Sequence, residues 1–138
     1  MSTTVQKLAA VFGVVFILAA VAGILASGGA GMHMNKTLAQ YPVALGLFPV
    51  NLLHNIVHLA FGVLGLAASR SFAHSVTYAK VGGIVYLVLA CLGFFVPVVA
   101  GLIPIGGNDV FLHIALGIGL AVIGFTAKPD GAMAPVGA

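Results

Sequence analysis

Residues 46–58 read GLFPVNLLHNIVH, and residues 101–113 read GLIPIGGNDVFLH. The two stretches align without a gap at an offset of 55, and Gly, Leu, Pro and the final His match. His54 falls opposite Asp109 in this alignment. The same pattern therefore occurs twice in the chain, and a long apolar segment follows each copy.

The composition indicates a membrane protein. The chain has 138 residues, of which 62% are hydrophobic and 5% charged, whereas a soluble domain carries about 25% charged residues. So few charges cannot cover a water-facing surface, and we expect a single membrane domain over residues 1–138. The Lys and Arg residues are scattered singly, which argues against nucleic acid as a partner. The lone cysteine, Cys91, implies no disulfide framework.

Four apolar segments are long enough, or nearly so, to cross a bilayer, which takes about 20 residues. They are rich in Ala, Leu and Gly and lack the alternation of membrane β-strands. The sequence therefore predicts an all-α fold, a bundle of four transmembrane helices at residues 8–26, 50–68, 78–99 and 110–127. Residues 128–138 are expected to form a loose tail.

The positive charges predict how the helices cross the membrane. Lys and Arg in short loops favour the cytoplasmic side. We therefore expect a multi-pass protein of the inner or plasma membrane, with both termini in the cytoplasm and both histidine-bearing stretches in the outer half. The predicted inner charges are Lys7, Arg70, Lys80 and Lys128, and the outer one is Lys36.

The helices that precede the two stretches also match. Residues 13–23 read GVVFILAAVAG, and residues 83–93 read GIVYLVLACLG, at an offset of 70. The chain is thus expected to contain two helical hairpins, residues 8–68 and 78–127, as a parallel repeat about an axis along the membrane normal. Glycines at helical spacing after His58 and His113 predict close helix packing, because small residues let helices approach.

Polar residues gather at the starts of the second and fourth helices. His54 and His58 are four residues apart and share one helix face, as do Asp109 and His113. If the repeat brings these helices together, three imidazoles and one carboxylate converge, a set that suits a divalent transition metal such as Zn²⁺, Fe²⁺ or Mn²⁺. The amides expected to orient the rings through hydrogen bonds are Asn51, Asn55 and Asn108.

Other interpretations of the cluster stay open. His58 and His113 on facing helices suit the axial ligands of a haem, and either alone suits a chlorophyll-type pigment. Alternatively, the polar residues hydrogen-bond one another, with Asn108 as a helix N-cap and Asp109 favoured by the helix dipole. The protein is then a non-catalytic accessory subunit that packs against a larger membrane complex or its own copies. Catalytic sequence motifs are absent, so no catalytic residue is predicted.

The longer stretches around these motifs resemble a known family. GLFPVNLLHNIVHLAFGVLGLAASRSFA, YAKVGGIVYLVLACLGFF and GLIPIGGNDVFLHIALGIGLAVIGF are similar to small four-helix bacterial membrane proteins catalogued as a domain of unknown function. The resemblance spans residues 8–125 and rests on an Asn-x-x-His-Asn-x-x-His run and an Asn-Asp-x-x-x-His run. It implies the four-helix fold and the membrane location, and it supplies no activity.

Overall fold

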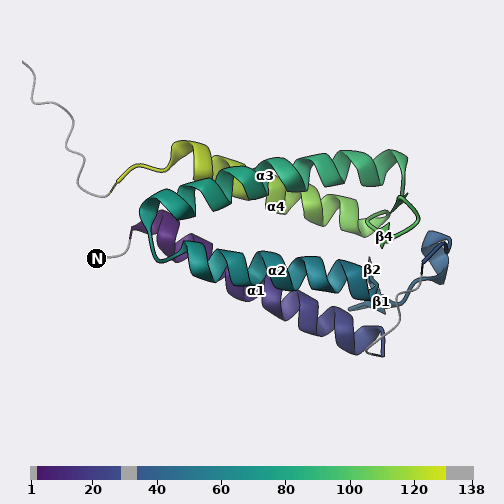
Figure 1. Cartoon of the computed structure of the whole chain (residues 1–138). Helices are drawn as coiled ribbons and strands as arrows, with labels where there is room; N and C mark the ends of the chain where they lie inside the picture. Colours follow the sequence, from purple (N-terminus) through teal and green to yellow (C-terminus); the bar gives the residue numbers. More distant parts are fainter. Residues whose placement is uncertain (1–2, 29–33, 130–138) are drawn as a thin grey trace, which may run out of the picture.

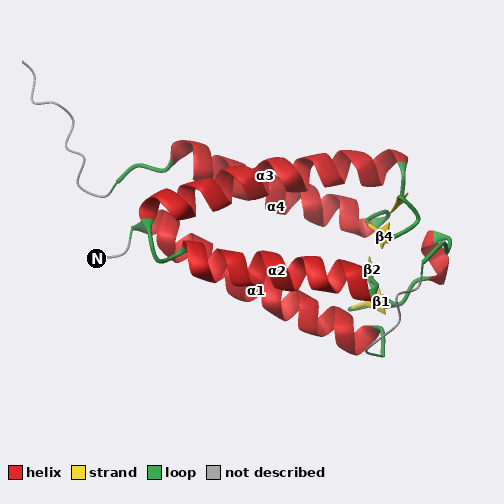
Figure 2. Cartoon of the chain, in the orientation of Figure 1, coloured by secondary structure: helices red, strands yellow, loops and turns green. Residues whose placement is uncertain are grey.

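The computed structural model describes residues 3–28 and 34–129, which form four α-helices (Figures 1 and 2). The predicted all-α, four-helix architecture is confirmed. The predicted tail lies outside the described residues, except for its first two positions. The helices are α1 (Thr4–Ala26), α2 (Leu52–Ala68), α3 (Phe72–Phe95) and α4 (Asn108–Thr126). The loops carry a 3-10 helix, η1 (Leu38–Gln40), and four two-residue strands, β1 (Val43–Ala44), β2 (Phe48–Pro49), β3 (Val98–Val99) and β4 (Ile103–Pro104).

The helices pack as two hairpins. The most extensive helix contacts join α1 to α2 and α3 to α4. In Figure 1 the hairpins lie closest at the short turn between α2 and α3, and they spread apart towards the end that carries the strands. Both strand pairs lie at this end, whereas α1 begins and α4 ends at the other. The repeated loops are therefore neighbours in space, although they are far apart in the sequence.

Within the described residues, three helices are long and apolar enough to cross a membrane, namely α1, α3 and α4, with 23, 24 and 19 residues. The second helix is shorter than predicted, with 17 residues, which rise about 26 Å at 1.5 Å each. Its predicted start at residue 50 is wrong, because Asn51 is the N-cap and the helix begins at Leu52. Large apolar side chains cover the outer faces of the helices, for example Leu18, Val63 and Phe111, which are 61%, 55% and 65% exposed.

The third helix begins six residues earlier than the predicted start at residue 78 and ends four residues before residue 99. The side chain of Ser71 accepts a hydrogen bond from His74 N at 3.1 Å and caps the helix. The exposed His74 is therefore helical, and the cationic Lys80 lies well inside the helix rather than near its start. Lys80 Nζ lies 5.2 Å from the ring centre of Phe125, a cation–π contact that suits a charge beside an apolar helix.

Glycines let the helices of each hairpin approach closely. A Cβ atom on Gly13 would lie 2.8 Å from Leu66 N, and one on Gly83 would lie 2.5 Å from Ala121 N. Both contacts are with backbone atoms, which cannot move aside, so these positions tolerate no side chain. The close seam therefore lies inside each hairpin, between α1 and α2 and between α3 and α4. The two seams use positions that correspond at the offsets of 70 and 55 seen in the sequence.

The two loop ladders have the same register. Each tight turn places a non-glycine residue in the left-handed region, Leu45 with φ 54° and Ala100 with φ 52°, a conformation that is uncommon outside Gly, Asn and Asp. A glycine with φ 69° follows in both turns. The strand pairings are Val43 with Pro49 and Ala44 with Phe48 in one ladder, and Val98 with Pro104 and Val99 with Ile103 in the other.

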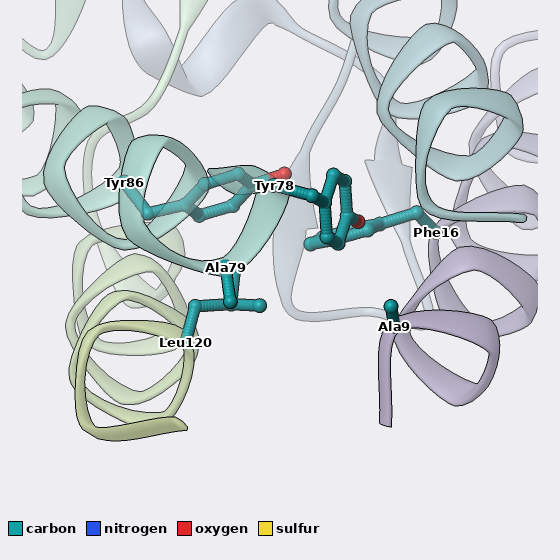
Figure 3. Packing of buried hydrophobic residues seen from close by; sticks show 6 residues of the cluster. All are labelled: Ala9, Phe16, Tyr78, Ala79, Tyr86 and Leu120. Atoms are coloured by element: carbon teal, nitrogen blue, oxygen red, sulfur yellow. The ribbon is translucent and has the colours of Figure 1, made fainter. Parts of the chain in front are cut away.

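A buried apolar cluster joins the hairpins in the middle of the bundle (Figure 3). The rings of Phe16 and Tyr86 are central to it, with centroids 5.2 Å apart. Phe16 also lies 5.8 Å from the ring of His58, and Tyr86 lies 4.9 Å from that of His113. The apolar core therefore packs directly against the rings of His58 and His113. The members of this core are Ala9, Phe16, Tyr78, Ala79, Tyr86 and Leu120.

Candidate metal centre

Three histidines and one aspartate meet between α2 and α4. His54, His58, His113 and Asp109 are all buried, with exposed fractions of 3%, 8%, 2% and 1%. One ring nitrogen from each histidine falls within 4.8 Å of the other two. The structure thus brings together the four residues that the sequence pattern selects, and the three-histidine group has a geometry that could hold a metal ion.

The ring of His54 is held by the opposite hairpin. Its Nδ1 lies 2.9 Å from the carbonyl oxygen of Pro104. A carbonyl only accepts, so Nδ1 carries the proton and the Nε2 of the neutral ring has the lone pair. Asn51 Oδ1 accepts a hydrogen bond from His54 N at 2.9 Å, and Asn51 Nδ2 donates to the carbonyl of Leu102. The start of α2 is therefore tied to the β3–β4 loop.

The ring of His113 is held in the same tautomer by its own helix. Its Nδ1 lies 2.8 Å from the backbone carbonyl oxygen of Asp109, one turn earlier. The ring stacks on Tyr86, with 22° between the planes. Two of the three rings thus donate Nδ1–H to a backbone carbonyl and keep a lone pair on Nε2. Metal-binding histidines are usually oriented in this way.

His58 completes the group from the next turn of α2. Its Nε2 lies 3.2 Å from His54 Nε2, and the two rings are 81° apart in plane. Nitrogen ligands of a tetrahedral ion at about 2.0–2.1 Å lie roughly 3.4 Å from one another, so this pair is already near ligand spacing. The widest separation in the group, up to 4.8 Å, would have to close by up to about 1.4 Å for the same geometry.

Asp109 brings a carboxylate to the edge of the histidine group. Its Oδ2 lies 3.4 Å from His113 Nδ1 and 3.8 Å from His54 Nε2. No hydrogen bond from the described residues satisfies this buried oxygen. A buried charge is costly unless it is paired or coordinates a metal. The carboxylate lies in the first turn of α4, where the helix dipole favours it.

The three asparagines have different surroundings. Asn51 is the cap described above, whereas the buried amide of Asn55 has no hydrogen-bond partner among the described residues and packs against Gly23. Asn108 is exposed, and the prediction that it caps α4 is wrong by one residue. Gly107 is the N-cap, with φ 66° and ψ −136°, a backbone conformation that glycine adopts readily. No hydrogen bond within the described ranges joins Asn55 or Asn108 to an imidazole ring.

A macrocycle between His58 and His113 meets an obstacle. The centroids of these rings are 6.5 Å apart and their planes differ by 42°. His54 Nε2 lies 3.2 Å from His58 Nε2, on the side where the flat ring system would have to extend. A haem with both histidines as axial ligands therefore requires the His54 ring to move out of its hydrogen bond with Pro104.

Two cavities flank the cluster, and both are lined by His54 and His58. The smaller one, about 90 Å³, lies beside α1 and the β1–β2 loop and includes Asp109 in its wall. The larger one, about 250 Å³, lies between α2 and α3 and includes His113 and Tyr86. His54 and His58 thus border both cavities, whose other lining residues are mostly apolar.

Three contributors to the site carry no obvious sequence signal as site residues. They are the carbonyls of Pro104 and Leu102 and the ring of Tyr86, which orient His54, Asn51 and His113. Pro104 and Leu102 do match across the repeated stretches, and Tyr86 aligns with Phe16 at the offset of 70. The repeat therefore marks these three positions in the sequence, but it does not assign a role to any of them.

The fold and the cluster define a small helical protein of membrane-spanning type with a buried, histidine-rich polar site. The chain belongs to the family described as Domain of unknown function (DUF4383), which matches residues 6–126. This agrees with the family resemblance seen in the motifs. Neither the curated proteins nor the solved structures contain a significant match to the chain.

Proposed function

We propose that this protein is a membrane metal-binding protein that holds a divalent transition metal between α2 and α4. The ligands are His54, His58 and His113, with Asp109 as the fourth. One observation carries the proposal: three buried imidazoles place ring nitrogens within 4.8 Å of one another. Two of them are held by backbone carbonyls in the tautomer that a metal ligand needs.

The donor set selects the class of metal. Neutral imidazoles suit Zn²⁺ and Fe²⁺, and a carboxylate beside them suits these ions and Mn²⁺. The metal would neutralise the buried carboxylate of Asp109, whose Oδ2 has no hydrogen-bond donor among the described residues. The protein's own part is to fix the rings, through Pro104 for His54 and through Tyr86 for His113.

The second candidate is an accessory subunit in which the cluster only joins the helix ends. The broad apolar faces of the helices favour it, since they offer surface to other membrane subunits or to a second copy. A purely structural network, however, should satisfy its own polar groups. The amide of Asn55 and the Oδ2 of Asp109 have no hydrogen-bond partner within the described part of the chain, so the observations favour the metal site.

The proposed setting is the inner or plasma membrane, with the cluster in the outer half and both termini in the cytoplasm. The distribution of Lys and Arg supports this orientation. We also propose that the domain is two copies of one helical hairpin, residues 8–68 and 78–127. The shared ladder register and the matching glycine seams support this repeat.

The proposal is tested by elemental analysis of the protein purified in detergent, with an absorption spectrum of the same sample. We expect one transition metal per chain in the parent. His58→Ala and His113→Ala should lose this metal. His74→Ala changes an exposed residue near the start of α3, outside the cluster, and should keep it. A metal-free parent that still folds contradicts the proposal, and a Soret band would point to a tetrapyrrole instead.

A further inference from the structure

We propose that the larger cavity beside the histidines is a binding site for the ring head of an isoprenoid quinone that enters from the bilayer. The inference rests on the membrane setting of the proposed function, but it does not require the metal. The cavity has a volume of about 250 Å³. Pockets for whole drug-sized ligands have roughly 300–1,000 Å³, so this space suits a head group whose tail remains outside.

The lining of the cavity selects a neutral ligand. One wall consists of the three imidazoles, and none of the described lining residues is Lys, Arg, Asp or Glu. An anionic lipid head would find no fixed positive charge there, and a cationic one no carboxylate, because Asp109 borders the other cavity. The remaining lining residues are Tyr86 and the aliphatic Val57, Val85, Leu89, Ile103 and Ile105.

His58 is the polar group that a neutral head would meet. It is the most exposed of the three histidines, at 8%, and it borders both cavities. No described residue forms a hydrogen bond with its Nδ1. In the metal-free protein the Nδ1 lone pair of His58 can accept a hydrogen bond from the hydroxyl of a quinol, and when a metal occupies Nε2 the Nδ1–H can donate one to a quinone carbonyl. The ring of either form packs well against an aromatic side chain such as Tyr86, which lines the same cavity.

The face between α2 and α3 also offers a place for a tail. On this face the cavity is lined by half-buried Val57 on α2 and by half-buried Val85 and Leu89 on α3. About one turn further along both helices lies a second, apolar cavity of about 270 Å³, bordered by Phe61 and Tyr78. An apolar tail can follow the two helices from one cavity to the next.

The test is saturation binding of a benzoquinone with a decyl tail, in its oxidised and its quinol form, to the full chain in phosphatidylcholine nanodiscs. Leu89→Phe and Ile103→Phe each add a ring to the lining of the cavity, the first from α3 and the second from β4. Val88→Phe adds the same ring to the exposed side of α3 and is the matched control. We expect saturable binding to the parent and to Val88→Phe, and binding weaker by roughly tenfold or more in both filled variants, because a clash excludes the head.

Two comparisons make the outcome decisive. Decanol shares the tail and lacks the head, so it should compete weakly; equal competition would show that the site takes only tails and would overturn the proposal. Equal quinone binding in all four proteins would overturn it as well. Metal content should be the same in the parent and in folded Leu89→Phe and Ile103→Phe. A parent that binds quinone and no metal contradicts the metal site alone, and the reverse result contradicts the quinone site alone.

Discussion

His54 Nε2 lies 3.2 Å from His58 Nε2, although the two rings are nearly perpendicular and belong to successive turns of α2. Two lone pairs cannot face each other at this distance without a proton or a cation between them. The proton of His54 is already on Nδ1, which faces the carbonyl of Pro104. In the metal-free protein, His58 must therefore supply the proton from its own Nε2.

This relationship predicts that metal binding changes the tautomer of His58. The metal-free protein should contain His58 as the Nε2–H form, and the loaded protein should contain it as the Nδ1–H form with Nε2 bound. His54 and His113 should keep Nδ1–H in both states, because their carbonyl partners do not change. Nitrogen chemical shifts of the labelled rings, measured with and without Zn²⁺, report the three tautomers separately. An unchanged His58 spectrum on addition of stoichiometric Zn²⁺ would falsify this arrangement.

The carboxylate of Asp109 should affect metal affinity and protein stability in opposite directions. Asp109→Asn keeps the shape and removes a buried charge that has no hydrogen-bond donor on Oδ2 among the described residues. We expect the metal-free variant to be as stable as the parent or more stable by about 1 kcal/mol, since burying an unpaired charge is costly. Metal affinity should fall about 10- to 100-fold.

Thermal unfolding in detergent and competition with a metal chelator measure the two effects on the same samples. His74→Asn serves as the control, because it changes an exposed residue on α3 outside the cluster. A variant that loses stability and keeps its metal would mean that Asp109 joins helix ends rather than binding an ion.

The sequence predicted the helices and the polar pair on each of α2 and α4 because both follow from short-range rules. Helix length comes from the apolar runs, and spacing by four places His54 with His58 and Asp109 with His113 on single faces. It did not predict which carbonyls hold the rings. Pro104 reaches His54 across 50 positions of the chain, and such a contact depends on how the two hairpins dock rather than on any local pattern.

The helix boundaries were less predictable where polar residues belong to helices. The sequence places the start of the third helix at residue 78, two positions before Lys80, yet α3 begins at Phe72 and the ammonium group of Lys80 lies over Phe125. A long side chain can carry its charge away from an apolar surface while its stem stays packed. The sequence predicts the start of α2 too early because Val50 is as apolar as the helix that follows, and only the cap at Asn51 marks the true beginning.

The glycine seam of the second hairpin predicts a position-specific loss of stability. In Gly83→Ala the new methyl group would lie 2.5 Å from Ala121 N, so α3 and α4 must separate. We expect a loss of about 1–3 kcal/mol, as for overpacked cores. In Gly119→Ala the nearest atom is Phe12 Cζ at 3.8 Å. That variant should be neutral or gain up to about 1 kcal/mol from helix propensity.

Denaturation curves in mixed detergent compare the two glycine variants directly. Both substitutions add one methyl group to a helix, so a difference between them reports the seam alone. Equal stability of Gly83→Ala and Gly119→Ala would mean that the α3–α4 contact is looser than the described geometry.

The last prediction concerns orientation, which decides from which side the cluster is reached. With both termini in the cytoplasm, the loop that carries η1 faces outwards and the turn between α2 and α3 faces inwards. Ala39→Cys and Arg70→Cys are both at exposed positions, and Cys91→Ala removes the native thiol from the background. A membrane-impermeant maleimide added to intact spheroplasts should label Ala39→Cys, and it should label Arg70→Cys only after permeabilisation. The opposite pattern would place the histidines in the inner half of the bilayer and would make the cytoplasm the source of any bound metal. The reason is that the histidines lie in the first two turns of α2 and α4, and these helices begin at the end of the bundle that carries the strand pairs and η1.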